Sequence, residues 1–178
     1  MTRKHVHVVQ GDHVVTDDPD VVLTTILGSC VAACMRDPVA GVGGMNHFLL
    51  PGDPGLAASD SMRYGVHAME LLVNGLLSHG ARRERLEAKL FGGARMVSGL
   101  SDIGAKNADF AERFLKQEGI RRLSSSLGGA QARRLQYWAV SGRARQMVVA
   151  GGEEAALAAA VRPTVIRPAP ETGAVELF

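Results

Sequence analysis

Short apolar segments separated by turn-forming residues fill the first part of the chain and restrict it to folds rich in β-structure. These segments cover residues 6–9, 21–27, 29–35 and 43–50, and valine is prominent in them. Aspartate, proline and glycine stand between them. β-Branched residues bounded by such turn residues are typical of strands. We therefore predict a strand in each of the four segments.

Helical periodicity appears only after these strands. Apolar residues spaced by three and four, such as Met62, Val66 and Met69, predict a helix over residues 61–79. A second amphipathic pattern covers 102–118, and further strands are predicted at 86–90, 135–140 and 143–149. The order lacks a regular βαβ rhythm, so the predicted fold class is α+β, with helices covering sheets.

The composition is typical of one compact domain with a biased end. The chain has 178 residues, of which 46% are apolar but only 4% are aromatic. We predict a single domain over 1–150 and a loosely held tail, rich in alanine and proline, over 151–178. No segment approaches the roughly 20 apolar residues of a membrane span, and the N-terminus lacks a signal-peptide core. We therefore expect a cytoplasmic protein without membrane insertion.

The step Gly28-Ser29-Cys30, with His47 on the next apolar segment, is the strongest candidate for catalysis. A nearby histidine can stabilise a thiolate nucleophile, which predicts a thiol pKa below the free value. The small residues Gly28 and Ser29 leave room for a substrate carbonyl and expose N–H groups as oxyanion donors. Free cysteine is often simply a buried core residue, and we assign Cys34 to the core.

Other binding chemistries have weak support. Cys30 and Cys34 would lie about 13 Å apart on an extended segment, too far for a disulfide. His5 and His7 share one strand face, a weak metal signal, and we expect no metal site and no cofactor. The formal charge of +2 is too small to indicate nucleic-acid binding.

An ordered set of motifs also carries a family resemblance. The segments 27–32, 37–38 and 43–51 resemble the signature of the CheD chemoreceptor glutamine deamidases. Further matches follow in the same order, at 63–65, 68–70, 88–94, 103–107 and 127–129. Departures at Val66-His67, Lys106, Ser126 and Ala132 concern partner contacts rather than the catalytic candidates.

This resemblance implies a catalytic triplet and a fold. The nucleophile falls on Cys30 and the histidine on His47, and a threonine six residues before the cysteine is Thr24. Side chains alternate along a strand, so we expect Thr24 on the face of Cys30 and Thr25 on the other. The implied fold has two packed mixed sheets flanked by helices, in α/β/β/α layers, as in toxins of the cytotoxic-necrotizing-factor type.

The resemblance also implies an activity and partners. The enzyme would be a protein-glutamine glutaminase, acting on the cytoplasmic helical region of methyl-accepting chemotaxis receptors without a cofactor. A CheC-type phosphatase is a possible partner. One alternative is a non-catalytic module that regulates such a phosphatase. Another is a cysteine hydrolase of protease or transglutaminase-like specificity.

Overall fold

Two β-sheets pack against each other in this computed structural model, which describes residues 3–52, 55–96 and 102–149. The first sheet has the order β1-β3-β8-β9. Its strands are β1 (Lys4–His7), β3 (Val21–Leu27), β8 (Arg133–Trp138) and β9 (Arg143–Val148). The second sheet has the order β2-β5-β4-β6-β7. Its strands are β2 (His13–Thr16), β5 (Val42–Asn46), β4 (Val31–Asp37), β6 (Glu87–Gly92) and β7 (Arg121–Leu127).

Both sheets are mixed, as predicted. In the four-stranded sheet β1 and β3 are parallel while β3–β8 and β8–β9 are antiparallel. In the five-stranded sheet only β6 and β7 are parallel. With two helices beside these sheets, the predicted α+β class is confirmed.

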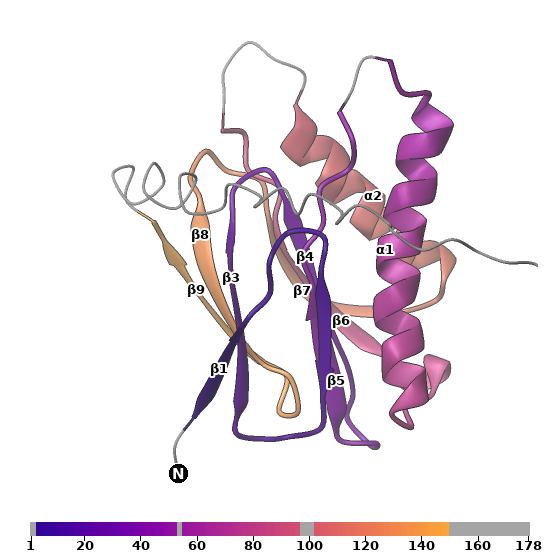
Figure 1. Cartoon of the computed structure of the whole chain (residues 1–178), viewed down its shortest axis with the longest axis vertical. Helices are drawn as coiled ribbons and strands as arrows, with labels where there is room; N and C mark the ends of the chain where they lie inside the picture. Colours follow the sequence, from indigo (N-terminus) through magenta and orange to yellow (C-terminus); the bar gives the residue numbers. More distant parts are fainter. Residues whose placement is uncertain (1–2, 53–54, 97–101, 150–178) are drawn as a thin grey trace, which may run out of the picture.

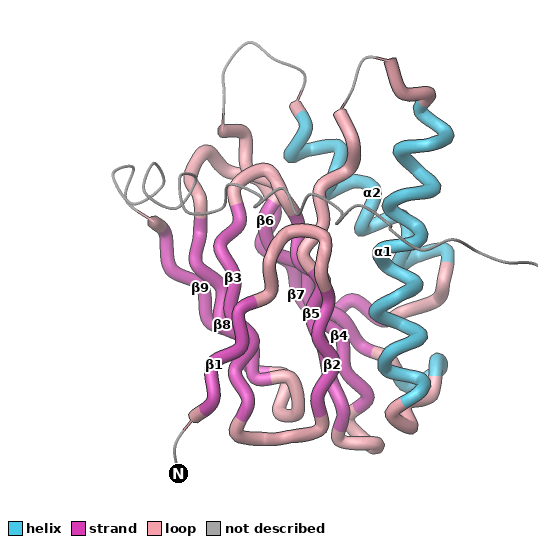
Figure 2. The backbone as a smooth tube through the Cα atoms, in the orientation of Figure 1, coloured by secondary structure: helices cyan, strands magenta, loops and turns pink. Residues whose placement is uncertain are grey.

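The two helices cover one side of the molecule (Figure 1). Helices α1 (Ala58–Ser78) and α2 (Ile103–Gln117) contact strands of the five-stranded sheet. The tube in Figure 2 shows the resulting order of layers: helices, five-stranded sheet, four-stranded sheet. Among the described residues, no helix covers the outer face of the four-stranded sheet, so this part of the chain has three of the four predicted layers.

Two apolar clusters hold these layers together. Between the helices and the five-stranded sheet, Met69 and Leu72 of α1 and Phe110 of α2 pack on the sheet. Between the two sheets lie Leu23 and Met45, with other apolar residues of both sheets. Strand β4 is buried on both faces, since Val31, Ala33 and Met35 belong to the first cluster and Ala32 and Cys34 to the second. The assignment of Cys34 to the core is confirmed.

Most predicted elements are present with shifted ends, but two strands were missed. Strand β7, of sequence RRLSSSL, is mostly exposed and lacks apolar alternation. Strand β2 has only four residues and lies in a segment that we interpreted as a connection. Both are edge strands, and neither contains a fully buried residue, so the apolar pattern of a core strand is absent from both. The predicted tail at 151–178 lies outside the described residues.

No helix in the described part of the chain is long and apolar enough to cross a membrane.

Candidate active site

Cys30 lies in a bend between β3 and β4 whose backbone is held on one side. The carbonyl oxygens of Gly28, Ser29 and Cys30 each accept a hydrogen bond. The donors are the Ala94 N–H at 2.9 Å, the Asn107 side-chain amide at 2.8 Å and the Gly93 N–H at 2.8 Å. In a trans peptide the N–H points opposite to the C=O. The N–H groups of Ser29 and Cys30 therefore point away from these donors.

Asn107 joins this bend to the segment that follows His47. The Asn107 side chain is fully buried, donates to the Ser29 carbonyl and accepts from the Leu50 N–H at 3.0 Å. Gly92 supports the bend from β6, with φ of 108° and no room for a Cβ beside the Cys30 carbonyl oxygen. Helix α2, strand β6 and the residues that follow β6 thus fix the position of Cys30.

His47 comes beside Cys30 because β4 and β5 are paired. An isolated bridge joins Val31 and Phe48, with N–H to carbonyl distances of 3.0 and 2.9 Å. Cys30 and His47 each precede a member of this pair, which makes them diagonal neighbours on one face. Diagonal residues of an antiparallel pair lie about 7–8 Å apart, a separation that an aromatic side chain such as that of His47 can span.

The surroundings of His47 fix its tautomer. The Thr25 hydroxyl donates to the Val8 carbonyl at 2.8 Å, so its oxygen accepts from His47 Nδ1, also at 2.8 Å. The Val8 carbonyl lies 3.3 Å from the same nitrogen and can only accept. Nδ1 therefore carries the proton, and Nε2 has a free lone pair. Nε2 is buried without a hydrogen-bond partner among the described residues.

The structure corrects the prediction for Thr24. The Thr24 hydroxyl points to the Val6 carbonyl at 3.5 Å, whereas Thr25, which is 1% exposed, contacts His47. The prediction assumed that side chains alternate regularly between the two strand faces from Thr24 to Cys30. Strand β3 ends at Leu27, so Gly28 and Ser29 form a bend in which the alternation no longer holds. Of these two threonines, Thr25 is the one whose hydroxyl contacts His47.

The predicted ion pair is also corrected. Burial raises the pKa of the Cys30 thiol to about 11, although its own backbone N–H opposes this. Burial lowers the pKa of His47 to about 4, against the opposing effect of the Val8 carbonyl. Near neutral pH the site therefore holds a thiol and a neutral imidazole. A neutral imidazole supplies no charge that would stabilise a Cys30 thiolate.

A glutamine that the sequence analysis did not single out completes the surroundings of the thiol. Cys30 Sγ donates to Gln10 Oε1 at 3.5 Å. Neither Gln10 nor the choice of Thr25 has a signal in the sequence, because each depends on contacts between separate strands. Asn107 stood in one of the matched motifs, without an assigned role.

The metal signal at the N-terminus stays weak. His5 and His7 are exposed on β1, and no group of three or more possible ligands lies together among the described residues.

Comparison with known proteins decides the family. A family model described as CheD chemotactic sensory transduction matches residues 49–147. The chain belongs to the CheD family. The match to the CheD model begins after Cys30 and His47, but curated relatives extend over both.

These CheD relatives match nearly the whole chain. A protein of Agrobacterium fabrum, named probable chemoreceptor glutamine deamidase CheD, is 57% identical over 98% of this chain and 97% of its own. One of Rhizobium meliloti with the same name is 60% identical over 93% and 92%. A solved structure, Neisseria meningitidis protein NMB0706, has a TM-score of 0.48 and 10% identity over 71% of this chain and 64% of its own.

Proposed function

We propose that this protein is a protein-glutamine glutaminase that converts glutamines of chemotaxis receptors to glutamate. The names of the relatives support the substrate class. The observation that carries the chemistry is the free lone pair of His47 Nε2, on the face of a cysteine whose bend presents two backbone N–H groups. A base, a nucleophile and oxyanion donors are the groups that acyl transfer requires.

The first half of the reaction forms a thioester. His47 Nε2 takes the thiol proton as Cys30 Sγ attacks the side-chain carbonyl carbon of a glutamine. The N–H groups of Ser29 and Cys30 stabilise the negative oxygen of the tetrahedral intermediate. His47 then returns the proton to the nitrogen, the C–N bond breaks, and ammonia leaves.

The second half uses the same groups. His47 Nε2 takes a proton from water, which attacks the thioester carbonyl, and the C–S bond breaks. The sulfur recovers its proton from His47 and glutamate is released. Thr25 and Val8 keep the imidazole in one tautomer throughout, which is the role of the third group in a catalytic triad. Neither half requires a metal or an organic cofactor.

For the substrate, we propose glutamines in the cytoplasmic helical region of methyl-accepting receptors. Cys30 and His47 have few groups with which to bind free glutamine, so contacts remote from the carboxamide would have to contribute the binding energy. A CheC-type phosphatase stays a proposed partner. Free glutamine should accordingly release no ammonia at a rate comparable to that of the receptor.

The decisive experiment is the intact mass of a receptor cytoplasmic fragment after incubation with the protein. The wild type should convert glutamine to glutamate at specific sites, and Cys30→Ala should convert none. Cys34→Ala is the matched control, a thiol removed from the core rather than from the site, and it should stay active. Cleavage of the fragment would indicate a protease instead. An unchanged fragment with the wild type would favour a non-catalytic binding module.

A further inference from the structure

The enzyme carries a carboxamide of its own at the nucleophile. The side-chain oxygen of Gln10 accepts a hydrogen bond from Cys30 Sγ at 3.5 Å. Gln10 belongs to the connection between β1 and β2 and is exposed. Its functional group is the one that the proposed reaction converts, since a substrate glutamine presents the same carboxamide to the same sulfur.

The main chain holds Gln10 in this place. Residues 9–12 form a turn, in which the Asp12 N–H donates to the Val9 carbonyl at 3.1 Å and Gly11 has φ of 92°. The turn is attached to the backbone of His47 on both sides. The Gly11 N–H donates to the His47 carbonyl at 2.8 Å, and the His47 N–H donates to the Asp12 carbonyl at 3.1 Å. A turn bound to the catalytic histidine therefore delivers the Gln10 side chain.

This contact uses the proton that catalysis needs. A thiol has one proton to donate, and here it is directed to Gln10 Oε1. His47 Nε2, the base that should receive it, has no partner within the described residues. The oxygen of the Gln10 amide, rather than its carbon, faces the sulfur. The contact therefore occupies the thiol and separates it from its base.

We propose that Gln10 is an internal competitor for the substrate carboxamide. It occupies the place at Cys30 where a receptor glutamine must bind, and it keeps the thiol proton away from His47 until the substrate displaces it. This inference rests on the proposed function for the identity of the displacing group. The turn that carries Gln10 is exposed, so a receptor segment that approaches Cys30 can move the side chain without unfolding the core.

Alkylation of Cys30 by iodoacetamide tests the contact without any turnover. Iodoacetamide is a small carboxamide that must reach the same sulfur. In the full-length Cys34→Ala protein, Gln10→Ala should raise the second-order rate roughly 3- to 10-fold, the effect of removing one hydrogen bond. Gln10→Met keeps the length of the side chain without its carboxamide and should also be faster than the parent. Val9→Ala, an exposed neighbour in the same turn, should leave the rate unchanged.

Equal rates in the parent and both Gln10 variants would overturn the proposal, and so would acceleration by Gln10→Ala alone. Thermal unfolding of each variant verifies that the comparison is between folded proteins. These outcomes do not depend on the activity. The proposed function is wrong if the receptor fragment is not deamidated, whereas the proposed role of Gln10 is wrong if the alkylation rate does not change with the residue at position 10.

Turnover provides the second readout. Loss of an internal competitor should lower KM for the receptor fragment while kcat changes little, because the groups that act in the transition state remain. A fall in kcat/KM in Gln10→Ala would show that Gln10 assists the substrate and would overturn the proposal.

Discussion

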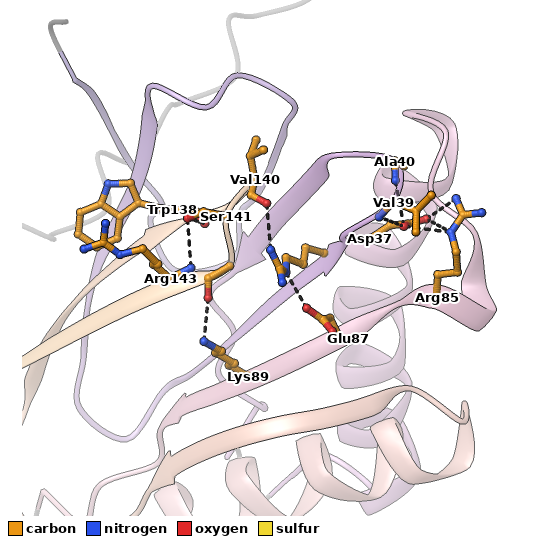
Figure 3. Close-up of polar contacts among 12 residues, drawn as sticks. Asp37, Val39, Ala40, Arg85, Glu87, Lys89, Trp138, Val140, Ser141 and Arg143 are labelled. Carbon is orange, nitrogen blue, oxygen red and sulfur yellow. Dashed lines mark hydrogen bonds and ion pairs between the residues drawn. The ribbon is translucent and has the colours of Figure 1, made fainter.

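The two ends of β4 differ in how many hydrogen-bond partners their polar side chains have. At its last residue, the fully buried Asp37 carboxylate meets several donors, as Figure 3 shows in part. They are the N–H groups of Val39, Ala40 and Arg82 and the guanidinium of Arg85. The Arg85 hydrogen bond, more than any other contact, holds the pKa of Asp37 well below its usual range. Just before its first residue, the half-buried Cys30 thiol has a single hydrogen-bond partner in the part of the chain that the structure describes, the side-chain oxygen of Gln10.

Figure 3 shows that this compensated end also joins the two sheets. The Arg36 guanidinium donates to Glu87 at 2.6 Å and to the Val140 carbonyl at 3.2 Å. Lys89 Nζ donates to the Gly142 carbonyl at 2.8 Å. These contacts attach the turn of the β8–β9 hairpin to β4 and β6. The charged groups named here all have partners within the fold, and these contacts stabilise the packing of the two sheets.

At the Cys30 end, the effect of burial outweighs the hydrogen bonds that oppose it. Burial keeps the thiol protonated and the His47 imidazole neutral, and Nε2 has no partner among the described residues. An unsatisfied buried polar atom costs stability, about 1–3 kcal/mol. In the proposed reaction, the same unpartnered nitrogen is the atom of His47 that accepts a proton. Hydrogen-bond satisfaction, rather than burial, therefore distinguishes the two ends of β4.

The largest expected effect concerns the titration of Cys30. In a Cys34→Ala background, so that one thiol is observed, the alkylation rate should rise through a pKa near 11. This is above the free-thiol value of about 8.5, because burial disfavours the thiolate. His47→Ala should shift this midpoint little, since a neutral imidazole supplies no charge. The opposite result would be a midpoint below the free-thiol value in the parent that returns to the free value in His47→Ala. It would show that a charged His47 stabilises the thiolate, as the sequence predicted, and that the two ends of β4 do not differ in this way.

The next effect concerns the stability of the opposite end. Asp37→Asn should lower the free energy of unfolding by about 3 kcal/mol, the cost of breaking a buried pair. The folded pKa of Asp37 is depressed, so its contribution is complete above the unfolded pKa of about 3.9 and is lost as the pH falls toward the folded value.

Denaturant unfolding over this acid range measures the contribution. The wild type should lose stability below about pH 4 more steeply than the Asn variant. The exposed Asp17→Asn is the matched control and should follow the wild type. Cys30 alkylation near neutral pH should be the same in all three proteins. An altered alkylation rate in Asp37→Asn would show that the two ends are coupled.

The sequence predicts only part of the fold and only part of the difference between the two ends of β4. Apolar alternation and helical spacing predict β3, α1 and α2, because burial dictates those patterns directly. The positions of Cys30 and His47 follow from their motifs. The direction of the pKa of Cys30 was wrong, because desolvation depends on how closely the sheets, the turn at Gln10 and the bend pack around the sulfur. No pattern within one segment contains that information.

The smallest effect tests which threonine belongs to the reactive end. Thr25→Val keeps the shape of the side chain but removes the hydroxyl that contacts both the Val8 carbonyl and His47 Nδ1. The Val8 carbonyl remains within 3.3 Å of Nδ1, so the imidazole keeps one partner. We therefore expect deamidation of the receptor fragment to fall about 10-fold rather than to vanish, the effect of one hydrogen bond.

Thr24→Val is the matched control on the other face of β3, where the hydroxyl has a long contact with the Val6 carbonyl. Its kcat should stay near the wild-type value. The opposite result, with Thr24→Val impaired and Thr25→Val active, would mean that the strand face is assigned wrongly. It would also mean that side chains alternate regularly from Thr24 to Cys30, despite the bend at Gly28 and Ser29.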